Sequence, residues 1–486
     1  MIALRAVLCD SNYRRLNSHS GELSLLDKIS IEGLRGFADK TEMVLSKPNG
    51  KPGSGLTLLT GPNNSGKSTI IEAIKLRSSV HQNPSFHVGM RNAKTDSVSI
   101  GYEIDGLTDT IVSARKGSSE TIVNKANELL PYVVPSRRQF SPSFGKSGAI
   151  GRDGYAMQAG SNSELRAQML TGFEGRLFEL EKNHVAFNAL LAEIVPDFMS
   201  WTIDQNEGGQ YFIKLNSSGK SHSLSGSGDG IISVFVIVAA LFDSQPGNVI
   251  AIDEPELSLH PSIQHRLAKI IARLSADRQI IVSTHSPYFV DPVALRNGAQ
   301  ILRTWDRGES IEVCQVSIAT CAELEALLSP NANNPHVFGL DAREIFFSDD
   351  PILVFEGQED VVFWPKVVAH KSHLADIPAY GWGSGGAANM TNVVSVLQAL
   401  GYRKVIGVLD NNRPMDLATL RRKFAEYLFV EIPAPDIRTK KAVAAREPVD
   451  GLVDPDGAVR PQYIAELDQR LIEMENFLAG QPISPN

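Results

Sequence analysis

The strongest chemical signal in the chain is a loop rich in glycine and serine that joins two apolar runs. Leu56 to Leu59 is typical of a buried strand, Gly61 to Thr69 reads Gly-Pro-Asn-Asn-Ser-Gly-Lys-Ser-Thr, and Ile70 to Ile74 is typical of a helix. A strand, such a loop and a helix in this order indicate a nucleotide-binding P-loop. Loop N–H groups and the helix N-terminus both favour an anion, so the run predicts a phosphate site.

Individual residues of this loop have separate predicted tasks. Lys67 is expected to reach the β- and γ-phosphates, and the Ser68 hydroxyl is expected to ligate Mg²⁺. The predicted nucleotide-binding residues are Asn63, Asn64, Ser65, Gly66, Lys67, Ser68 and Thr69.

A second candidate anion site precedes the apolar run Ile231 to Phe242. The turn there reads Ser225-Gly226-Ser227-Gly228, and we expect Ser225, Gly226 and Gly228 to bind nucleotide at a helix N-terminus. Such turns are common, so this one gains its weight from the motifs that follow it.

Two further apolar runs end in residues suited to phosphoanhydride hydrolysis. Val249 to Ile252 is followed by Asp253 and Glu254, and the run that starts at Ile280 ends in His285. We expect Asp253 to hold Mg²⁺ through water, Glu254 to polarise the attacking water and His285 to hydrogen-bond the γ-phosphate. A lone histidine is more often structural, but the order of the motifs favours the catalytic interpretation.

A separate group of acids lies nearer the C-terminus. Glu356 follows the apolar run Ile352 to Phe355, Asp360 lies one turn into the next helical segment, and Asp410 follows Val405 to Leu409. Two buried strands that each deliver a carboxylate at the C-terminal end predict a Mg²⁺ site rather than a salt-bridged surface.

The P-loop, the Ser/Gly turn, the Asp-Glu pair and His285, in this order, resemble the ABC-type ATPase heads of SMC, RecF and related DNA-metabolism proteins. The resemblance implies that ATP binds between two copies and that Ser225 to Gly228 of one subunit completes the site of the other. The longest apolar run is well short of the ~20 residues that cross a bilayer, which disfavours a transporter. No long heptad array separates the P-loop from the turn, which excludes a coiled-coil arm.

The second group of acids resembles a Toprim domain. An ABC-type ATPase followed by a Toprim domain is the layout of the OLD (overcoming lysogenization defect) family, which includes the nuclease subunit of the Gabija antiphage system. The implied fold is α/β, with the ATPase in residues 1–345, an insertion at about 79–200, and a smaller parallel-sheet Toprim domain in residues 346–486. A turn-rich stretch at 329–335 precedes this boundary.

The family pattern assigns roles by motif. Glu356 and Asp360 match its Glu-Gly-x-x-Asp/Glu acids, Asp410 matches the first acid of its D-x-D, and Lys440 or Lys441 fits its lysine near the scissile phosphate, with Lys440 preferred. Asn412 replaces the second acid, and an amide oxygen without charge would hold a second metal ion less tightly.

The resemblance implies ATP, with Mg²⁺ or Mn²⁺, as cofactors and DNA, further copies of the chain and a defence-system protein as partners. The leading hypothesis is a nucleotide-controlled DNA endonuclease in antiphage defence. The alternative is an ATPase sensor or scaffold whose Toprim domain is catalytically weak and acts by binding partners. Asn412 keeps this alternative open.

Several elements must position these residues. A hairpin is expected before the P-loop strand, amphipathic helices in 164–191, a short helix in 321–328 and an amphipathic helix in 461–478. The basic stretch Ser136-Arg137-Arg138-Gln139 fits a solvated turn as well as a phosphate or DNA contact. Those at 421–423 and 438–441 fit a solvated helix face as well as a strip that binds the DNA backbone.

Composition narrows the class of protein. The 486 residues carry a net charge of −8, and 42% of them are hydrophobic, as expected for a globular protein of two domains. Bulk charge therefore does not indicate a nucleic-acid binder. Three cysteines without zinc spacing and the lack of a signal peptide or membrane span predict a cytoplasmic protein.

Overall fold

A computed structural model of the chain gives the fold. It describes residues 24–78, 84–114, 120–138, 143–145, 150–155, 170, 173–196, 200–217, 220–224, 228–316, 320, 339–369, 371–440 and 448–482.

A sheet of six strands forms the centre of the N-terminal part. Its strands are β3 (Leu56–Thr60), β7 (Tyr132–Val134), β12 (Val249–Asp253), β13 (Gln279–Ser283), β14 (Gln300–Asp306) and β15 (Ile311–Gln315). The strand order is β15-β14-β3-β13-β12-β7, and β15 runs antiparallel to β14 while the other pairs are parallel. Every residue of β3, β12 and β13 is buried, which explains why the sequence shows continuous apolar runs there.

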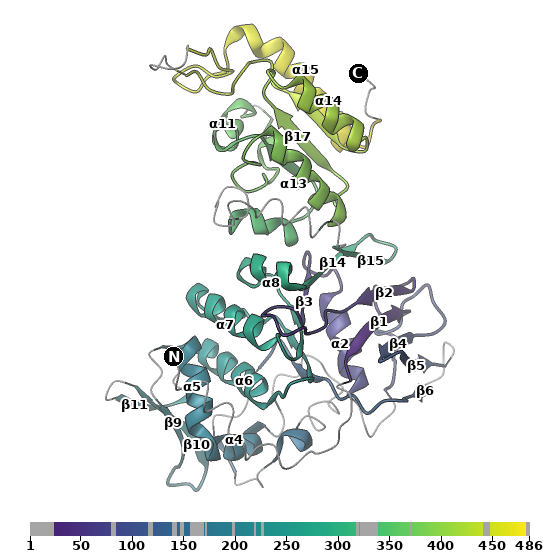
Figure 1. Cartoon of the computed structure of the whole chain (residues 1–486), viewed down its shortest axis with the longest axis vertical. Helices are drawn as coiled ribbons and strands as arrows, with labels where there is room; N and C mark the ends of the chain where they lie inside the picture. The colour runs from purple at the N-terminus through teal and green to yellow at the C-terminus, as the bar shows by residue number, and fades with distance from the viewer. Residues whose placement is uncertain are drawn as a thin grey trace.

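Helices cover both faces of this sheet. Helix α2 (Lys67–Arg77) packs on one face, and α6 (Asp229–Asp243) and α7 (Pro261–Leu274) pack on the other. Successive strand residues alternate between the two cores, so Ile281 packs on the α2 side and Ile280 on the α6 side. Figure 1 shows this layer arrangement in the lower part of the molecule.

Two antiparallel sheets flank the central one. The first has the order β2-β1-β4-β5-β6 and shares its core with α2; the second has the order β11-β10-β8, with β9 paired to β10. Helices α4 and α5 share a core with the second sheet and α6, and Trp201 of β9 contacts Phe235 of α6. The bounds are β1 Leu26–Glu32, β2 Thr41–Val44, β4 Ser99–Ile104, β5 Leu107–Ser113, β6 Thr121–Asn124, β8 Ser143–Phe144, α4 Phe173–Lys182, α5 His184–Ile194, β9 Ser200–Gln205, β10 Tyr211–Ser217 and β11 Lys220–Ser223.

The C-terminal part contains its own parallel sheet of three strands. The strands are β16 (Ile352–Phe355), β17 (Val405–Leu409) and β18 (Leu428–Glu431), in that order. Helices α13 (Ala387–Ala399) and α14 (Pro414–Lys423) cover one face, and α11 (Gln358–Val367) and α15 (Ile464–Leu478) cover the other. This part, green to yellow in Figure 1, meets the N-terminal part beside β14 and β15.

Short helices complete the described chain. They are η3 Pro287–Phe289, α8 Pro292–Asn297, η4 Asp341–Phe346, α12 Ser372–Ala375 and η5 Pro461–Tyr463. Within the described ranges, no helix has the length and apolar character needed to cross a membrane.

The structure confirms several of the expected elements. Strands β1 and β2 form the hairpin before the P-loop strand, with Ile29 opposite Met43, and α15 is the C-terminal amphipathic helix. Helix α2 begins three residues before the predicted start at Ile70, because the P-loop lysine and serine already belong to its first turn. The helix predicted at 321–328 and the turn at 329–335 lie outside the described residues. The predicted boundary at 345/346 falls within η4 and stays a prediction.

Candidate functional site

The P-loop connects β3 to α2 through backbone conformations that favour glycine. Gly61 and Gly66 have φ angles of 126° and 99°, and a Cβ atom on Gly61 would lie 2.3 Å from the carbonyl oxygen of Thr304. A side chain at position 61 would therefore clash with β14. The glycines predicted to shape this loop have a steric reason to be there.

Lys67 lies at the N-terminus of α2 and faces the loop. Its Nζ donates to the carbonyl oxygens of Gly61 at 2.9 Å and Pro62 at 2.6 Å. Burial lowers the pKa of Lys67 to about 8, although the carboxylates of Glu254 and Asp253 oppose that shift. A phosphate placed here would add to the negative charge of these carboxylates and would stabilise the buried ammonium further.

Two of the predicted Mg²⁺ ligands meet at the ends of β3 and β12. The Ser68 hydroxyl lies 3.5 Å from Oδ1 of Asp253, and Asp253 is fully buried. A hydroxyl and a carboxylate oxygen are the hard donors that Mg²⁺ prefers, so these residues fit the ion. Strands β3 and β12 are parallel strands of one sheet with β13 between them, so the end of β12 and the start of α2, which follows β3, lie at the same edge.

Glu254 follows Asp253 in an uncommon backbone conformation. Its φ angle is 47°, and its N–H donates to the carbonyl oxygen of Ser283 at 2.8 Å. Left-handed backbone at a non-glycine residue persists where the surroundings hold it, and such residues cluster at functional sites. The turn therefore presents the predicted general base at the same edge as the P-loop.

Arg138 fixes this turn, a role that the sequence did not reveal. Its guanidinium donates to the carbonyl oxygens of Asp253 at 2.7 Å and Glu254 at 2.8 Å, and to the Ser233 hydroxyl at 2.9 Å. Arg138 is buried, and burial lowers its pKa to about 10. Arg138 is therefore neither part of a solvated turn nor a free phosphate or DNA contact, the two interpretations of this basic stretch, because its guanidinium is buried against the backbone.

His285 follows β13, and a second unpredicted residue, Glu256, holds its backbone in place. The Glu256 carboxylate accepts from the backbone N–H of His285 at 2.6 Å and from the Thr284 hydroxyl at 2.8 Å. Burial, with the charge of Lys67, lowers the pKa of His285 to about 4. The imidazole is therefore neutral at pH 7 and has one N–H to donate to a phosphate oxygen.

The Ser/Gly turn is described only in part. Ser225 and Gly226 lie outside the described residues, and Gly228 caps the N-terminus of α6 with extended backbone and an exposed surface. The predicted binding role of this turn stays a prediction.

The acids of the C-terminal part converge at one edge of the small sheet. Asp360 Oδ2 accepts from the N–H of Gly357 at 2.8 Å, whereas Glu356 Oε2 and Asp410 Oδ1 are buried without a hydrogen-bond partner. Burial and neighbouring carboxylates raise the pKa of Asp360 to about 7 and that of Asp410 to about 8. Asp436, which the sequence analysis did not include, contributes to both shifts.

Basic side chains lie against this acidic cluster. Arg413 Nη2 is 3.3 Å from Glu356 Oε1, and Lys440 pairs with Asp436 and, at 3.5 Å, with Glu359. Lys441 lies outside the described residues. Lys440 therefore lies beside Asp436 and Glu359, and its role near a scissile phosphate stays a prediction.

The fit of a metal ion to this cluster is partial. Buried carboxylate oxygens without a hydrogen bond are suitable ligands, but no three His, Cys, Asp or Glu side chains in the described ranges are arranged to hold a metal ion. The Asn412 amide donates to the carbonyl oxygen of Pro435 at 2.9 Å. A divalent cation at this site would therefore require the acids to move closer together.

The basic run at 421–423 is partly committed to the fold. Arg421 donates to the carbonyl oxygen of Phe429 at 2.8 Å, and Lys423 Nζ donates to the Ser395 hydroxyl at 3.1 Å. Because both side chains are bonded within the protein, they fit neither a free DNA-binding strip nor a fully solvated helix face.

Two protein-family models match the N-terminal part, and both describe AAA domains. The model described as "AAA domain" matches residues 28–127, and the model described as "AAA domain, putative AbiEii toxin, Type IV TA system" matches residues 161–291. The first match contains the P-loop, and the second contains Asp253, Glu254 and His285. The N-terminal part is therefore an AAA-type P-loop ATPase.

Individual relatives are more distant. The chain is 26% identical over 271 residues to the Septu protein PtuA of Bacillus thuringiensis, a match that covers 50% of this chain and 68% of that protein. An Smc head bound to the C-winged helix domain of ScpA is 16% identical, covers 60% of this chain and 98% of its own, and has a TM-score of 0.40. An Smc head with an extended coiled coil, bound to the C-terminal domain of ScpA from Pyrococcus furiosus, is 15% identical, covers 62% and 99%, and has a TM-score of 0.41. At these values the two structures add nothing to the functional assignment.

Protons and metal ions should compete for the acidic cluster. The pKa values of about 7 for Asp360 and about 8 for Asp410 exceed the ~4 of an unfolded aspartate. The stability that these carboxyls contribute is therefore fully present below pH ~4 and is lost as the pH rises toward ~8. We expect the metal-free melting temperature, measured by scanning fluorimetry, to fall between about pH 4 and pH 8, and Mg²⁺ to raise it more at the higher pH. Equal Mg²⁺ effects at both pH values would contradict this account, and Asp410→Asn should weaken the pH dependence.

Proposed function

We propose that this chain is an OLD-type protein in which an ATP-binding head controls a Mg²⁺-dependent Toprim endonuclease that cleaves DNA in antiphage defence. The observation that carries the nuclease proposal is the group of buried carboxylates at the ends of β16 and β17, with Lys440 beside them. The similarity to the Septu protein PtuA supports a role in defence.

In the head, several residues have separate roles in the hydrolysis of ATP. Lys67 binds the β- and γ-phosphates, Glu254 takes the proton of the attacking water, and neutral His285 donates to the γ-phosphate. Ser68 and Asp253 would hold Mg²⁺, which offsets the charge of the phosphates when bound. Arg138 and Glu256 keep Glu254 and His285 in position.

In the C-terminal part, Glu356, Asp360 and Asp410 would hold the metal ion, which activates water and stabilises charge on the scissile phosphate when bound. Lys440 would donate to that phosphate. Arg413 and Arg438 add positive charge around the acids, as a DNA backbone requires. The test is cleavage of a supercoiled plasmid with Mg²⁺ or Mn²⁺, with and without ATP, by the wild type and by acid variants.

The alternative function is an ATPase sensor or scaffold whose second domain binds partners. Two observations favour it: the acids do not form a closed metal site in the described ranges, and the Asn412 amide is bonded to Pro435. Absence of metal-dependent cleavage of any DNA form, together with phage protection that is retained in Glu356→Ala, would favour this alternative over the nuclease.

Assembly follows from the proposed head. The exposed N-terminus of α6 at Gly228 is open to a second copy, and the shared site is expected to be two-fold symmetric. Glu254→Gln, which should retain ATP, is expected to form at least a dimer with ATP, measured by light scattering. Lys67→Ala is the matched control. Because it should not bind ATP, we expect its mass to be the same with and without ATP. A Glu254→Gln variant that remains a monomer with ATP bound would exclude the shared site.

A further inference from the structure

Thr304 of strand β14 contacts the P-loop. Thr304 Oγ1 lies 2.5 Å from the Ser65 hydroxyl and 3.1 Å from the carbonyl oxygen of Thr60, and Ser65 Oγ lies 2.8 Å from the carbonyl oxygen of Pro62. Each hydroxyl has one hydrogen, so either Thr304 donates to Ser65, which donates to Pro62, or Ser65 donates to Thr304, which donates to Thr60. Because the Thr304 carbonyl also packs against Gly61, this one residue of β14 restrains both the start and the middle of the phosphate-binding loop.

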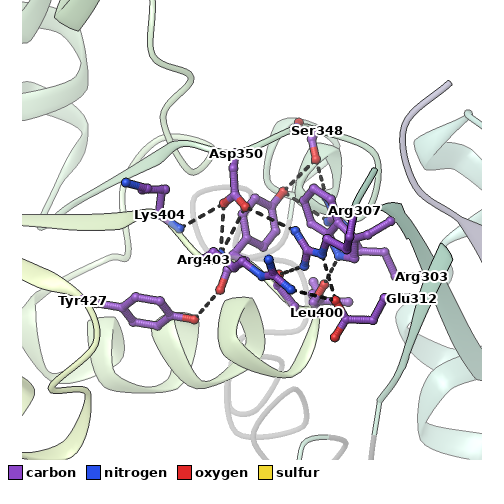
Figure 2. A network of polar contacts seen from close by, with 12 residues as sticks. Arg303, Arg307, Glu312, Ser348, Asp350, Leu400, Arg403, Lys404 and Tyr427 are labelled. Atoms are coloured by element: carbon purple, nitrogen blue, oxygen red, sulfur yellow. Dashed lines mark hydrogen bonds and ion pairs between the residues drawn. The ribbon is translucent and has the colours of Figure 1, made fainter. Parts of the chain in front are cut away.

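The side chain of Arg303, the residue before Thr304, lies on the opposite face of β14 and contacts residues of the C-terminal part. Arg303 is fully buried, and its guanidinium lies 4.2 Å from the ring centre of Trp305 and 4.3 Å from that of Tyr402. It donates to the Tyr402 hydroxyl at 3.1 Å and to the carbonyl oxygen of Ser348. Figure 2 shows the side chain of Arg303 directed toward Ser348 within this network.

The residues that follow complete the same junction. Trp305 Nε1 donates to the carbonyl oxygen of Leu400 at 2.7 Å, and Arg307 Nη2 donates to that of Gly401 at 2.6 Å. A Cβ atom on Gly401 would lie 2.9 Å from Trp305 Nε1. The turn at 400–402 therefore packs directly on β14, and one apolar cluster continues from the six-stranded sheet into the C-terminal part.

We propose that β14 is a coupling strand, in which Thr304 positions the P-loop while Arg303 and Trp305 anchor the same strand to the C-terminal part. Nucleotide affinity then depends on contacts of Tyr402, a residue of the other part. The inference rests on the proposed ATP-binding function and specifies how the second domain is linked to it.

The physical reason is preorganisation. A strand held firmly on its second-domain face keeps Thr304, and through it Ser65, in the geometry that accepts phosphate, which lowers the ordering cost of binding. Because coupling between two sites is reciprocal, bound nucleotide must in turn stabilise the junction. Arg303 has little freedom to move, since its charge is buried and depends on these partners and on the nearby Asp350 carboxylate for stabilisation.

Nucleotide titration of junction variants of the full chain tests the proposal. Tyr402→Phe keeps the aromatic ring but removes the hydroxyl that accepts from Arg303 and donates to the Ile345 carbonyl oxygen at 2.7 Å. We expect this variant to raise the dissociation constant of ATP by about fivefold, and Thr304→Val to do the same. The two effects should be non-additive in the double variant. In the wild type, ATP should slow hydrogen exchange of the amides at 400–404, and in Thr304→Val it should not.

Tyr427→Phe is the matched control. It also removes one buried hydroxyl, which donates to the Tyr402 carbonyl oxygen at 2.6 Å, but it leaves the Arg303 contact intact. It should change the ATP dissociation constant less than twofold, and melting curves of all variants show whether they fold. Arg303→Met, which replaces the buried charge by an apolar chain, should weaken ATP binding as Tyr402→Phe does.

Two outcomes overturn the proposal and separate its failure from that of the proposed function. If folded Tyr402→Phe and Arg303→Met both bind ATP as the wild type does, β14 does not couple the parts, although the head remains an ATP-binding domain. If the folded wild type binds no ATP, the proposed function and the coupling are both wrong.

Discussion

Lys67→Ala is expected to abolish ATP binding, raising the dissociation constant at least ~100-fold. The reason is that Lys67 is the buried cation of the loop, and a hydrogen bond to a charged group contributes up to ~3 kcal/mol. In the structure, its Nζ donates hydrogen bonds to the carbonyl oxygens of Gly61 and Pro62. The ammonium group is therefore already directed into the loop, where phosphate would bind. Binding of a fluorescent ATP analogue measures the effect.

Glu254→Gln should separate binding from hydrolysis. An amide at this position still fits the turn that Arg138 holds, but it has no basic oxygen to accept the proton of water. We expect ATP affinity within a few-fold of the wild type and a turnover number lower by ~10²–10⁴, the usual contribution of a general base.

Exposed residues supply the controls for both substitutions. Lys51→Ala and Glu207→Gln change the same residue types at exposed positions outside the predicted site, and each should leave binding and turnover unchanged. Wild-type turnover in Glu254→Gln would show that another group is the base. Retained binding in Lys67→Ala would remove the P-loop assignment.

The second large effect is expected in the C-terminal part. Glu356→Ala and Asp410→Ala should each eliminate DNA cleavage, because each removes a buried carboxylate oxygen that has no partner other than a prospective metal ion. ATP hydrolysis should remain largely intact, since both residues lie on a different sheet from the P-loop. Plasmid cleavage and phosphate release, measured on the same preparations, report the two activities.

Asp376→Ala is the control for lost charge, because Asp376 is an exposed acid of the same part. Asn412→Asp should increase cleavage and metal affinity, since a carboxylate cannot donate to the Pro435 carbonyl and supplies the charge that Mg²⁺ prefers. Suppose the wild type cuts no DNA form with either metal ion, and Glu356→Ala still protects cells from phage. The domain is then a binding module, and the sensor function replaces the nuclease.

The sequence by itself determined the local architecture of the nucleotide site. The P-loop, the Asp-Glu pair after β12 and the His after β13 are each contiguous with the strand that delivers them, so apolar runs and glycines located them. The same reasoning located the strands that carry Glu356 and Asp410. Local patterns suffice here because a buried parallel strand and the turn after it are specified by adjacent residues.

Only the tertiary structure decided which distant residues support these sites. Arg138 reaches Asp253 and Glu254 because β7 pairs with β12, and Thr304 reaches Ser65 because β14 pairs with β3. No feature near Arg138 or Thr304 in the sequence indicates these pairings. Strand neighbours that far apart are selected by how whole apolar faces pack, and a period-2 pattern shows which face is buried but not which strand lies beside it. For the same reason the contribution of Asp436 to the acidic cluster, and the burial of Arg303 between the two parts, emerged only when the sheets were assembled.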